Sequence, residues 1–275
     1  MKSRSSYSTA GLIVVFLSVI NLLNPISDVF VSAFPPPHYH NSYSKNSVVS
    51  DGAESKTRRN AWRSYNPDEL ENRYGFFISA VVPRPVAVIT TVDQDSGVVN
   101  CAPFSYTSIS SHDPPIVTHG ISIKAGGIKK DTLRNIESTG QWVYNILTTN
   151  YLEAANACAG NFDPTTSEIN ETNLSTLPCQ VVSVPRLAEA PVSLECELYK
   201  TEEIFNDDGQ HTTTIVMGRV RQIHVQEEVL KDDCNPEGSP VVDLQKIQPV
   251  GRAGDVTYYP VGVSEGSALP MPRPK

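Results

Sequence analysis

The sequence predicts a mainly β protein whose antiparallel sheet is closed into a barrel or packed as a sandwich. From Trp62 onward, β-branched segments alternate with turn residues. Only three stretches have helical character, and they do not alternate regularly with the strands, which disfavours a doubly wound parallel sheet. With 275 residues, 39% of them hydrophobic, the chain can bury a core, and we expect one body domain over residues 65–262.

The first predicted strands form a hairpin. Residues 87–92 are a β-branched run that ends in the turn cluster 93–97, and the apolar pattern resumes at Val98. Three further segments show the alternation expected of half-buried strands: residues 116–123, 141–147 and 192–199.

A long strand over residues 212–225 follows the turn 206–209, and Gly218 within it predicts a bulge or a bend. The helical stretches are short. They are residues 66–70, with Asn66 as cap and Pro67 at the first helical position, residues 132–138, and residues 152–159 before Gly160.

The charge of the chain is unevenly distributed. Residues 1–65 hold seven Lys and Arg against three Asp and Glu, a formal +4, and the rest holds fifteen against twenty-seven, a formal -12. An acidic body repels the phosphate backbone of nucleic acids, so we expect no nucleic-acid partner. Any phosphate-binding site must therefore depend on a local cluster of positively charged residues.

The N-terminus has the order of a secretory signal over residues 1–33. Lys2 and Arg4 precede the apolar run 11–23, and small residues follow at 31–33. The run is too short to cross a bilayer, so we expect no stable membrane span in the mature chain, and a signal anchor is the weaker alternative.

Residues 34–64 are expected to be a disordered, transit-like linker, and residues 263–275 a flexible tail. The Ser-Ala-Phe-Pro string at residues 32–35 and the basic tract after it resemble the two-part leaders that direct proteins to the plastids of secondary-plastid algae. The alternative is an ordinary signal peptide and linker on a secreted or endomembrane protein.

Several kinds of site find no support in the sequence. The five cysteines are scattered, without a C-x-x-C, so neither a disulfide framework nor a zinc site is predicted, and most should be small buried residues. The dinucleotide, P-loop, zinc-protease and lipase motifs are absent. None of the six histidines pairs with another at ligand spacing, so no metal is predicted.

The densest cationic region is residues 122–132, where three lysines surround a Gly-Gly turn that opens into a helix. Amide groups at the helix start, the Thr132 hydroxyl and the Lys130 ammonium could together bind a phosphate. The alternative is a solvated turn in which Asp131 caps the helix.

Pro103 interrupts a second unusual segment, residues 100–108. Proline removes a donor from the strand ladder, which predicts an edge strand, a bulge or a rim that faces a ligand. Small residues beside Phe104 and Tyr106 would let a planar ring lie against the backbone there.

Short motifs follow one another through most of the body domain. They are residues 82–91 (VPRPVAVITT), 100–105 (NCAPFS), 113–115 (DPP), 130–132 (KDT), 185–186 (PR), 190–191 (AP), 195–196 (EC), 209–212 (GQHT), 217–220 (MGRV) and 249–252 (PVGR). Their order and spacing resemble the flavin reductase-like family of FMN-binding split-barrel proteins. The resemblance covers roughly residues 70–260.

This resemblance implies an antiparallel Greek-key split β-barrel with a few short helices. It also implies a homodimer that holds FMN in a groove near the dimer interface. Carried over by position, Arg84, Thr90 and Thr91 lie near the ribityl-phosphate or the ring edge. The residues expected along the isoalloxazine are Asn100, Ala102, Pro103 and Ser105. Those expected at the phosphate are Ser122, Lys130 and Thr132.

The implied activity is oxidoreduction, in which NAD(P)H passes hydride to FMN and a second flavin, oxygen or another small-molecule acceptor is then reduced. His211 is the candidate catalytic residue, as an orienting group for the nicotinamide or a stabiliser of charge; the alternative is a hairpin histidine without such a role. Many relatives have Gly-Asp-His-Thr where this chain has Gln210 before His211. Because that carboxylate is missing, an FMN-binding module without nicotinamide-dependent turnover is the alternative function.

Overall fold

The computed structural model describes residues 62–262. The predicted signal over residues 1–33, all but the last three residues of the linker 34–64, and the tail 263–275 lie outside the described residues. The localisation of the protein therefore stays a prediction. Among residues 62–262, no helix is long and apolar enough to cross a membrane.

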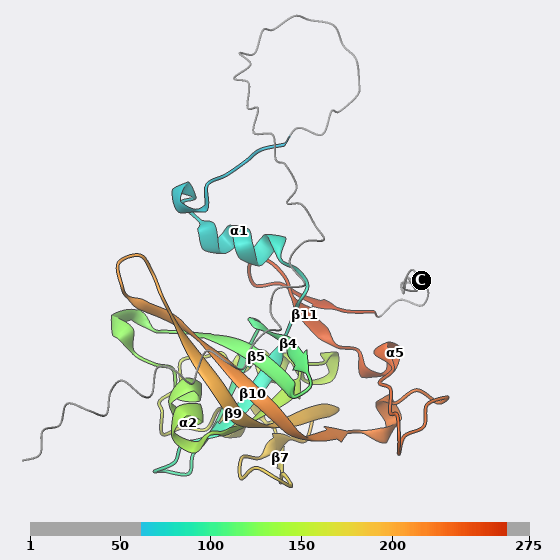
Figure 1. The fold of residues 1–275 in the computed structure, drawn as a ribbon. Helices are drawn as coiled ribbons and strands as arrows, with labels where there is room; N and C mark the ends of the chain where they lie inside the picture. Colours follow the sequence, from blue (N-terminus) through green and yellow to red (C-terminus); the bar gives the residue numbers. More distant parts are fainter. Residues whose placement is uncertain (1–61, 263–275) are drawn as a thin grey trace, which may run out of the picture. The chain divides into compact units, whose positions relative to one another are not determined.

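A seven-stranded antiparallel sheet forms the centre of the domain (Figure 1). Its strands, in spatial order, are β3 (Val99–Phe104), β2 (Ala87–Val92), β6 (Gln141–Ile146), β9 (Val192–Phe205), β10 (His211–Val225), β5 (Pro115–Ser122) and β4 (Thr107–His112). Strands β3 and β4 occupy opposite edges, yet only Ser105 and Tyr106 connect them. So short a connection requires the sheet to curl until its edges approach, which makes a barrel. The predicted antiparallel, mainly β fold is confirmed.

Two small sheets accompany the barrel. One contains β1 (Arg84–Pro85), β11 (Val250–Arg252) and β12 (Tyr258–Pro260), and the other contains β7 (Thr176–Leu177) and β8 (Arg186–Leu187).

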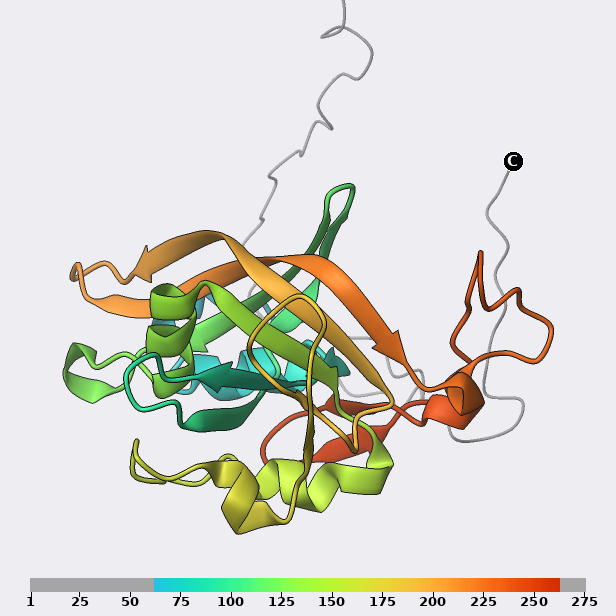
Figure 2. The ribbon, with the colours of Figure 1, turned by 90° about the horizontal axis from the view of Figure 1, so that it is seen from below.

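The helices are short, as predicted. They are α1 (Arg73–Ala80), α2 (Asp131–Thr139), α3 (Leu152–Ala157), α4 (Glu168–Thr172) and α5 (Leu244–Ile247), with 3₁₀ turns η1 (Pro67–Glu69), η2 (Ala125–Gly127), η3 (Thr149–Tyr151) and η4 (Glu227–Val229). The three predicted helical stretches correspond to η1, α2 and α3, whereas α1, α4 and α5 were not predicted. Helices α3 and α4 lie side by side on the face turned away from β9 and β10 (Figure 2).

The core has two large parts, one on each face of β2, and a third, small cluster in which Val143 packs with Val182 and Val184. Ala87 and Ile89 pack inside the barrel with Trp142, whereas Val86 and Val88 pack on the other face in a cluster that includes residues of α3 and α4. Because successive side chains of a strand point to opposite faces, both sets can be apolar only if both faces are covered. This double burial explains the unbroken β-branched run in the sequence.

Gly218 marks a bulge, as predicted. The register between β9 and β10 shifts between Met217 and Gly218. A Cβ atom at Gly218 would lie 2.2 Å from Cζ2 of Trp142, so the absence of a side chain lets the fully buried indole fill the barrel interior.

Strand β9 is longer than predicted. It extends to Phe205 rather than ending near residue 199, and its added part pairs with β10 in a long hairpin (Figure 1). The added residues are mostly polar and exposed, so they lack the alternation that marks a half-buried strand.

Candidate functional site

A polar cleft lies between the edge strand β3 and the start of α2, with a volume of about 170 Å³. We call it the β3–α2 cleft. It gathers five of the predicted site residues: Asn100, Ala102, Pro103, Lys130 and Thr132. Its other lining residues are Phe104, Lys124, Asp131, Cys158, Ala159, Gly160, Asn161, Phe162 and Glu168. As predicted from Pro103, β3 is an edge strand, and its free side forms one wall of the cleft.

The three lysines before α2 differ in their partners. Lys129 donates to Glu137 at 2.7 Å, and Lys124 lies 3.6 Å from a carboxylate oxygen of Asp131. Among residues 62–262, Lys130 has no carboxylate partner, and its Nζ lies 5.7 Å from the centre of the Phe104 ring. Burial lowers the pKa of Lys130, and the nearby Lys124 lowers it further. Lys130 is therefore a partly desolvated cation that can pair with an incoming anion.

The first turn of α2 has unused donors. Lys130 occupies the N-cap position without a side-chain cap, and the amides of Asp131 and Thr132 donate to no group of the described residues. Asp131 is the first helical residue and pairs with Lys124 and Arg134, so the alternative in which it caps the helix is wrong. The free amides and the positive end of the helix dipole favour an anion at this point.

A chain of buried hydrogen bonds positions the cleft. Asn100 Nδ2 donates to Thr132 Oγ1 at 3.0 Å and lies 3.3 Å from Thr91 Oγ1. Asn135 Nδ2 also donates to Thr91 Oγ1, at 3.1 Å. Thr91 thus holds β3 and α2 together instead of lining the cleft, and the Thr132 hydroxyl keeps its own proton for another acceptor.

One carboxyl group in the cleft wall is held in an environment that disfavours its charge. Glu168 Oε2 accepts a hydrogen bond from the Cys101 amide at 2.8 Å. Burial raises the pKa of Glu168 in spite of this bond. Its repulsion of a bound anion is reduced to the extent that the group is protonated.

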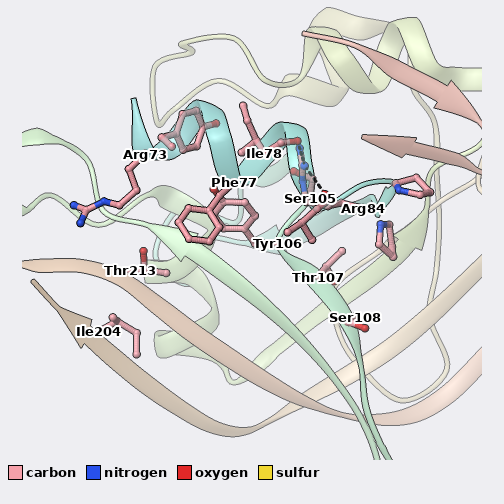
Figure 3. A pocket seen from close by; sticks show the side chains of 14 residues that line it. Arg73, Phe77, Ile78, Arg84, Ser105, Tyr106, Thr107, Ser108, Ile204 and Thr213 are labelled. Carbon is pink, nitrogen blue, oxygen red and sulfur yellow. Dashed lines mark hydrogen bonds between the residues drawn. The ribbon is translucent and has the colours of Figure 1, made fainter. Parts of the chain in front are cut away.

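A larger, apolar pocket begins where β3 ends (Figure 3). We call it the α1–β4 pocket; its volume is about 930 Å³. Ser105, which follows β3 directly, lines it together with Tyr74, Phe77, Tyr106 and Ile204. The chain therefore runs from the polar β3–α2 cleft to an apolar, aromatic surface within a few residues.

Comparison with known proteins identifies the family. Residues 79–245 match the flavin reductase like domain, which is more than half of the chain. The chain belongs to the flavin reductase-like family.

Similar proteins and structures agree with this assignment. An uncharacterised protein of Halalkalibacterium halodurans is 33% identical over 199 residues, which cover 72% of this chain and 91% of the relative. Nitrilotriacetate monooxygenase component B of Bacillus cereus has a TM-score of 0.69 at 31% identity and covers 75% of this chain and 98% of its own. The 2-nitrobenzoate 2-nitroreductase of Pseudomonas fluorescens has a TM-score of 0.64 at 26% identity, covering 78% of this chain and 99% of its own.

The split barrel is confirmed by a further neighbour. A structure from Shewanella frigidimarina described as a flavin reductase with a split barrel domain has a TM-score of 0.61 at 21% identity, covering 75% of this chain and 96% of its own. At that identity, the likeness concerns the fold alone.

Besides Thr91, Ser105 and His211, three further predicted site residues of this flavin reductase-like protein lie outside the cleft. The buried Arg84 guanidinium donates to the carbonyls of Ile78, Val81 and Ala253 and lines the α1–β4 pocket. Thr90 Oγ1 donates to the Pro185 carbonyl at 2.7 Å. Ser122 is exposed at the end of β5. Arg84 thus connects the end of α1 to the chain after β11, whereas neither Thr90 nor Ser122 lines the cleft or the pocket.

His211 begins β10 at the tip of the β9–β10 hairpin. Its Nε2 lies 2.9 Å from Thr214 Oγ1, its Nδ1 lies 4.0 Å from Glu203 Oε1, and its ring centre is 5.3 Å from that of Phe205. Glu203 was not predicted, because it is eight positions away in the sequence and approaches His211 only through the hairpin register. The hairpin thus brings a carboxylate near His211, although none precedes the histidine in the sequence.

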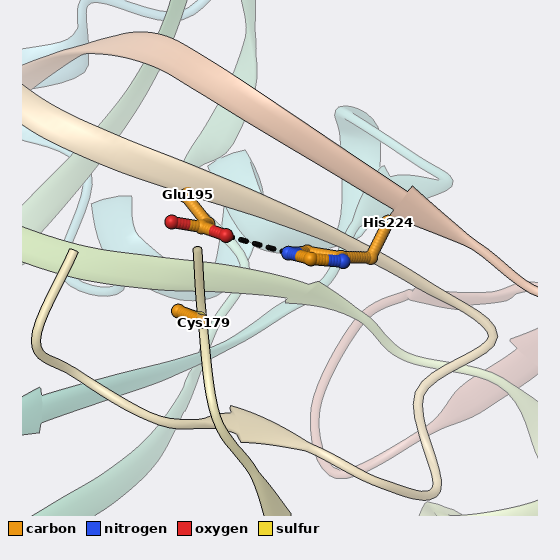
Figure 4. A group of neighbouring side chains, drawn as sticks. All are labelled: Cys179, Glu195 and His224. Atoms are coloured by element: carbon orange, nitrogen blue, oxygen red, sulfur yellow. Dashed lines mark hydrogen bonds and ion pairs between the residues drawn. The ribbon is translucent and has the colours of Figure 1, made fainter. Parts of the chain in front are cut away.

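A second group of titratable side chains is structural (Figure 4). Glu195 is fully buried and accepts hydrogen bonds from three consecutive amides, those of Gln180, Val181 and Val182, and from His224 Nε2. Burial acts to raise the pKa of Glu195, but these hydrogen bonds lower it to about 2. Both oxygens of the Glu195 carboxylate therefore already have hydrogen-bond partners. Through them Glu195 holds the loop 180–182, which follows Cys179, against the sheet.

Proposed function

We propose that this flavin reductase-like protein binds FMN and transfers hydride equivalents from NAD(P)H to a second, small-molecule acceptor. The observation that carries the proposal is that, among residues 62–262, Lys130 has no carboxylate partner and the first amides of α2 have no acceptor, beside the edge strand that bears Asn100 and Pro103. The names of the relatives, a monooxygenase component and a nitroreductase, support a redox role.

The donor set of the β3–α2 cleft fits a phosphate monoester. Lys130 would supply a charge, the first amides of α2 would supply oriented N–H groups, and Thr132 a hydroxyl. Glycines at positions 126 and 127 have φ values of 78° and 76°, which a residue with a side chain rarely adopts, and this backbone directs the loop into α2.

The cleft is too small for a whole flavin mononucleotide. Its 170 Å³ falls below the roughly 300–1,000 Å³ typical of pockets that enclose a drug-sized ligand. We therefore assign the phosphate and the adjoining ribityl carbons to the cleft, and the ring to the rim from Ala102 to Ser105. The apolar α1–β4 pocket continues that rim and would exclude water from one side of the ring.

Bound FMN would supply hydride and electron transfer, so no protein base is required. The chain's task is to bind, orient and exclude water. His211, held by Thr214 and near Glu203, would orient the nicotinamide or stabilise charge that develops beside it.

The proposal includes a homodimer. Large apolar side chains are exposed around the α1–β4 pocket: Tyr74 is 67% exposed, Phe77 49%, Tyr106 43% and Ile109 79%. Such a patch on a soluble domain favours an interaction surface. A second copy of the chain that covers this patch would complete the groove beside the flavin ring.

Reconstitution of the purified chain tests the proposal. The protein is titrated with FMN, and flavin absorbance that stays with the protein after gel filtration is measured; FAD and riboflavin are compared. Oxidation of NADH and NADPH is then followed by the loss of the absorbance of the reduced nicotinamide. A colourless protein that FMN does not saturate rejects the cofactor assignment. Saturable FMN binding without oxidation of either nicotinamide selects the alternative, a flavin-binding module without turnover.

A further inference from the structure

Two cysteines from distant parts of the sequence meet beside the β3–α2 cleft. Cys101 belongs to β3, and Cys158 directly follows α3. Both are buried in the same apolar cluster, at 0% and 2% exposure, and each thiol shifts the pKa of the other. The Thr172 hydroxyl of α4 lies 3.5 Å from Cys158 Sγ.

The two thiols are not equivalent. The Cys101 thiol lowers the pKa of Cys158, which burial would raise, and the Thr172 hydroxyl lowers it further. The Cys158 thiol and burial both raise the pKa of Cys101. Since the thiolate is the reactive form of cysteine, Cys158 is the more nucleophilic member and Cys101 is the adjacent thiol that can react with it next.

The remaining cysteines within residues 62–262 have no comparable arrangement. Cys196 is fully buried, and burial raises its pKa. Burial and the nearby Glu195 raise the pKa of Cys179 to about 12. Cys234 is half-buried and, like Cys179 and Cys196, does not line the β3–α2 cleft. Of the cysteines within residues 62–262, Cys158 is the one that lines the cleft, with Cys101 in the same buried cluster.

We propose that Cys101 and Cys158 form a site of reversible oxidation, in which hydrogen peroxide converts the two thiols into a disulfide. The Cys158 thiolate attacks one peroxide oxygen, the S–O bond forms as the O–O bond breaks, and the departing hydroxide takes a proton to become water. Cys101 then attacks the Cys158 sulfur, the S–S bond forms as the S–O bond breaks, and a second water leaves. Both sulfurs are oxidised by one electron each, and one peroxide is reduced to two waters.

Access limits which oxidants can react. Cys158 lines the cleft but is only 2% exposed, so we expect it to react with a molecule as small as hydrogen peroxide, whereas a bulky aromatic disulfide reagent needs local opening to reach it. The new bond would join β3 to the segment after α3, which are two walls of the cleft. This site does not depend on a bound flavin.

The test uses the full chain, reduced, freed of reductant and then treated with hydrogen peroxide. Intact-mass measurement should show the loss of two hydrogen atoms per chain, and peptide mapping without reductant should show a peptide that links Cys101 to Cys158. Dithiothreitol should restore both thiols. In native protein, a bulky aromatic disulfide should leave the pair unmodified.

Variants separate the two roles. Cys101→Ser should stop the reaction at a sulfenic acid on Cys158 that dimedone traps, and Cys158→Ser should abolish both products. Cys196→Ser, which removes a buried thiol with no cysteine beside it, is the matched control and should keep the cross-link. A peroxide-treated wild-type protein whose map shows Cys101 and Cys158 both as free thiols, or Cys158 oxidised further with no link, overturns the proposal even if the variants fail to fold.

Discussion

Replacing Lys130 with methionine tests the phosphate site at its most specific contact. Methionine retains a long apolar side chain that can still pack near Phe104, but it removes the charge. Because no carboxylate of residues 62–262 pairs with Lys130, the substitution leaves no anion without a partner. We expect the free energy of unfolding to change by less than about 0.5 kcal/mol, as for an ordinary surface substitution.

The effect on FMN binding should be much larger than the effect on folding. One hydrogen bond to a charged group is worth about 1.5–3 kcal/mol, which corresponds to a roughly 10- to 150-fold increase in the FMN dissociation constant. Riboflavin has no phosphate, so its dissociation constant should not change. The comparison of the two ligands isolates the contact between the ammonium and the phosphate.

The assay is a fluorescence titration of the flavin-free protein with FMN and with riboflavin. Lys129→Met is the control, because it removes the same charge at the neighbouring position. Lys129 pairs with Glu137 at 2.7 Å and lies 3.8 Å from Glu203. The control variant should weaken FMN binding no more than a few-fold. Equal losses for the two variants, or a loss for riboflavin equal to that for FMN, would refute the assignment of Lys130 to the phosphate.

Three further substitutions test how the fold supports the site. Arg84→Met should lower the free energy of unfolding by about 2–4 kcal/mol in urea titrations, because three carbonyls lose their donor; a fully stable variant would contradict this. Gly218→Ala should cost about 1–3 kcal/mol and alter Trp142 fluorescence, because the added Cβ overlaps the indole; an unchanged urea midpoint would contradict the close approach. Glu195→Gln should lower stability at neutral pH. The pKa of Glu195 falls from 4.5 to about 2 on folding, so its contribution is present above pH 4.5 and is lost as the pH falls toward 2. Thermal unfolding of the variant across that range should be less pH-dependent than that of the wild type.

The strands could be predicted because their signals are local. The run at β2, the turn after it and the alternation in β5 and β6 each depend on neighbouring residues only. Helix α1 was not predicted, because its local signals are weak. Its sequence RYGFFISA contains Gly75 and buries only Ile78, so it lacks an apolar stripe, and the sole local signal was Asn72, whose side chain caps the helix by accepting from the Gly75 amide.

The cleft could be predicted in part. Residues that share a strand or a turn, such as Asn100 with Pro103 or Lys130 with Thr132, stay together in any fold that keeps those elements. Which charges remain free depends on contacts that no local pattern reveals. Lys129 meets Glu203 through the hairpin, and Arg84 meets a carbonyl 169 residues away, so neither partner could be predicted from the sequence.

The acidic body and the proposed anion site are compatible because they act over different distances. At physiological ionic strength the screening length is about 8 Å, so the charge of -12 carried by residues 66–275 acts weakly on a group inside the cleft. The nearer charges decide binding. Asp131 is paired with Lys124 and Arg134, and Glu168 has a raised pKa, so the acids beside the cleft are compensated or partly neutral, while Lys130 has no carboxylate partner within residues 62–262. Net charge thus disfavours polyanionic partners at the surface, and the local arrangement would still accept the proposed single phosphate.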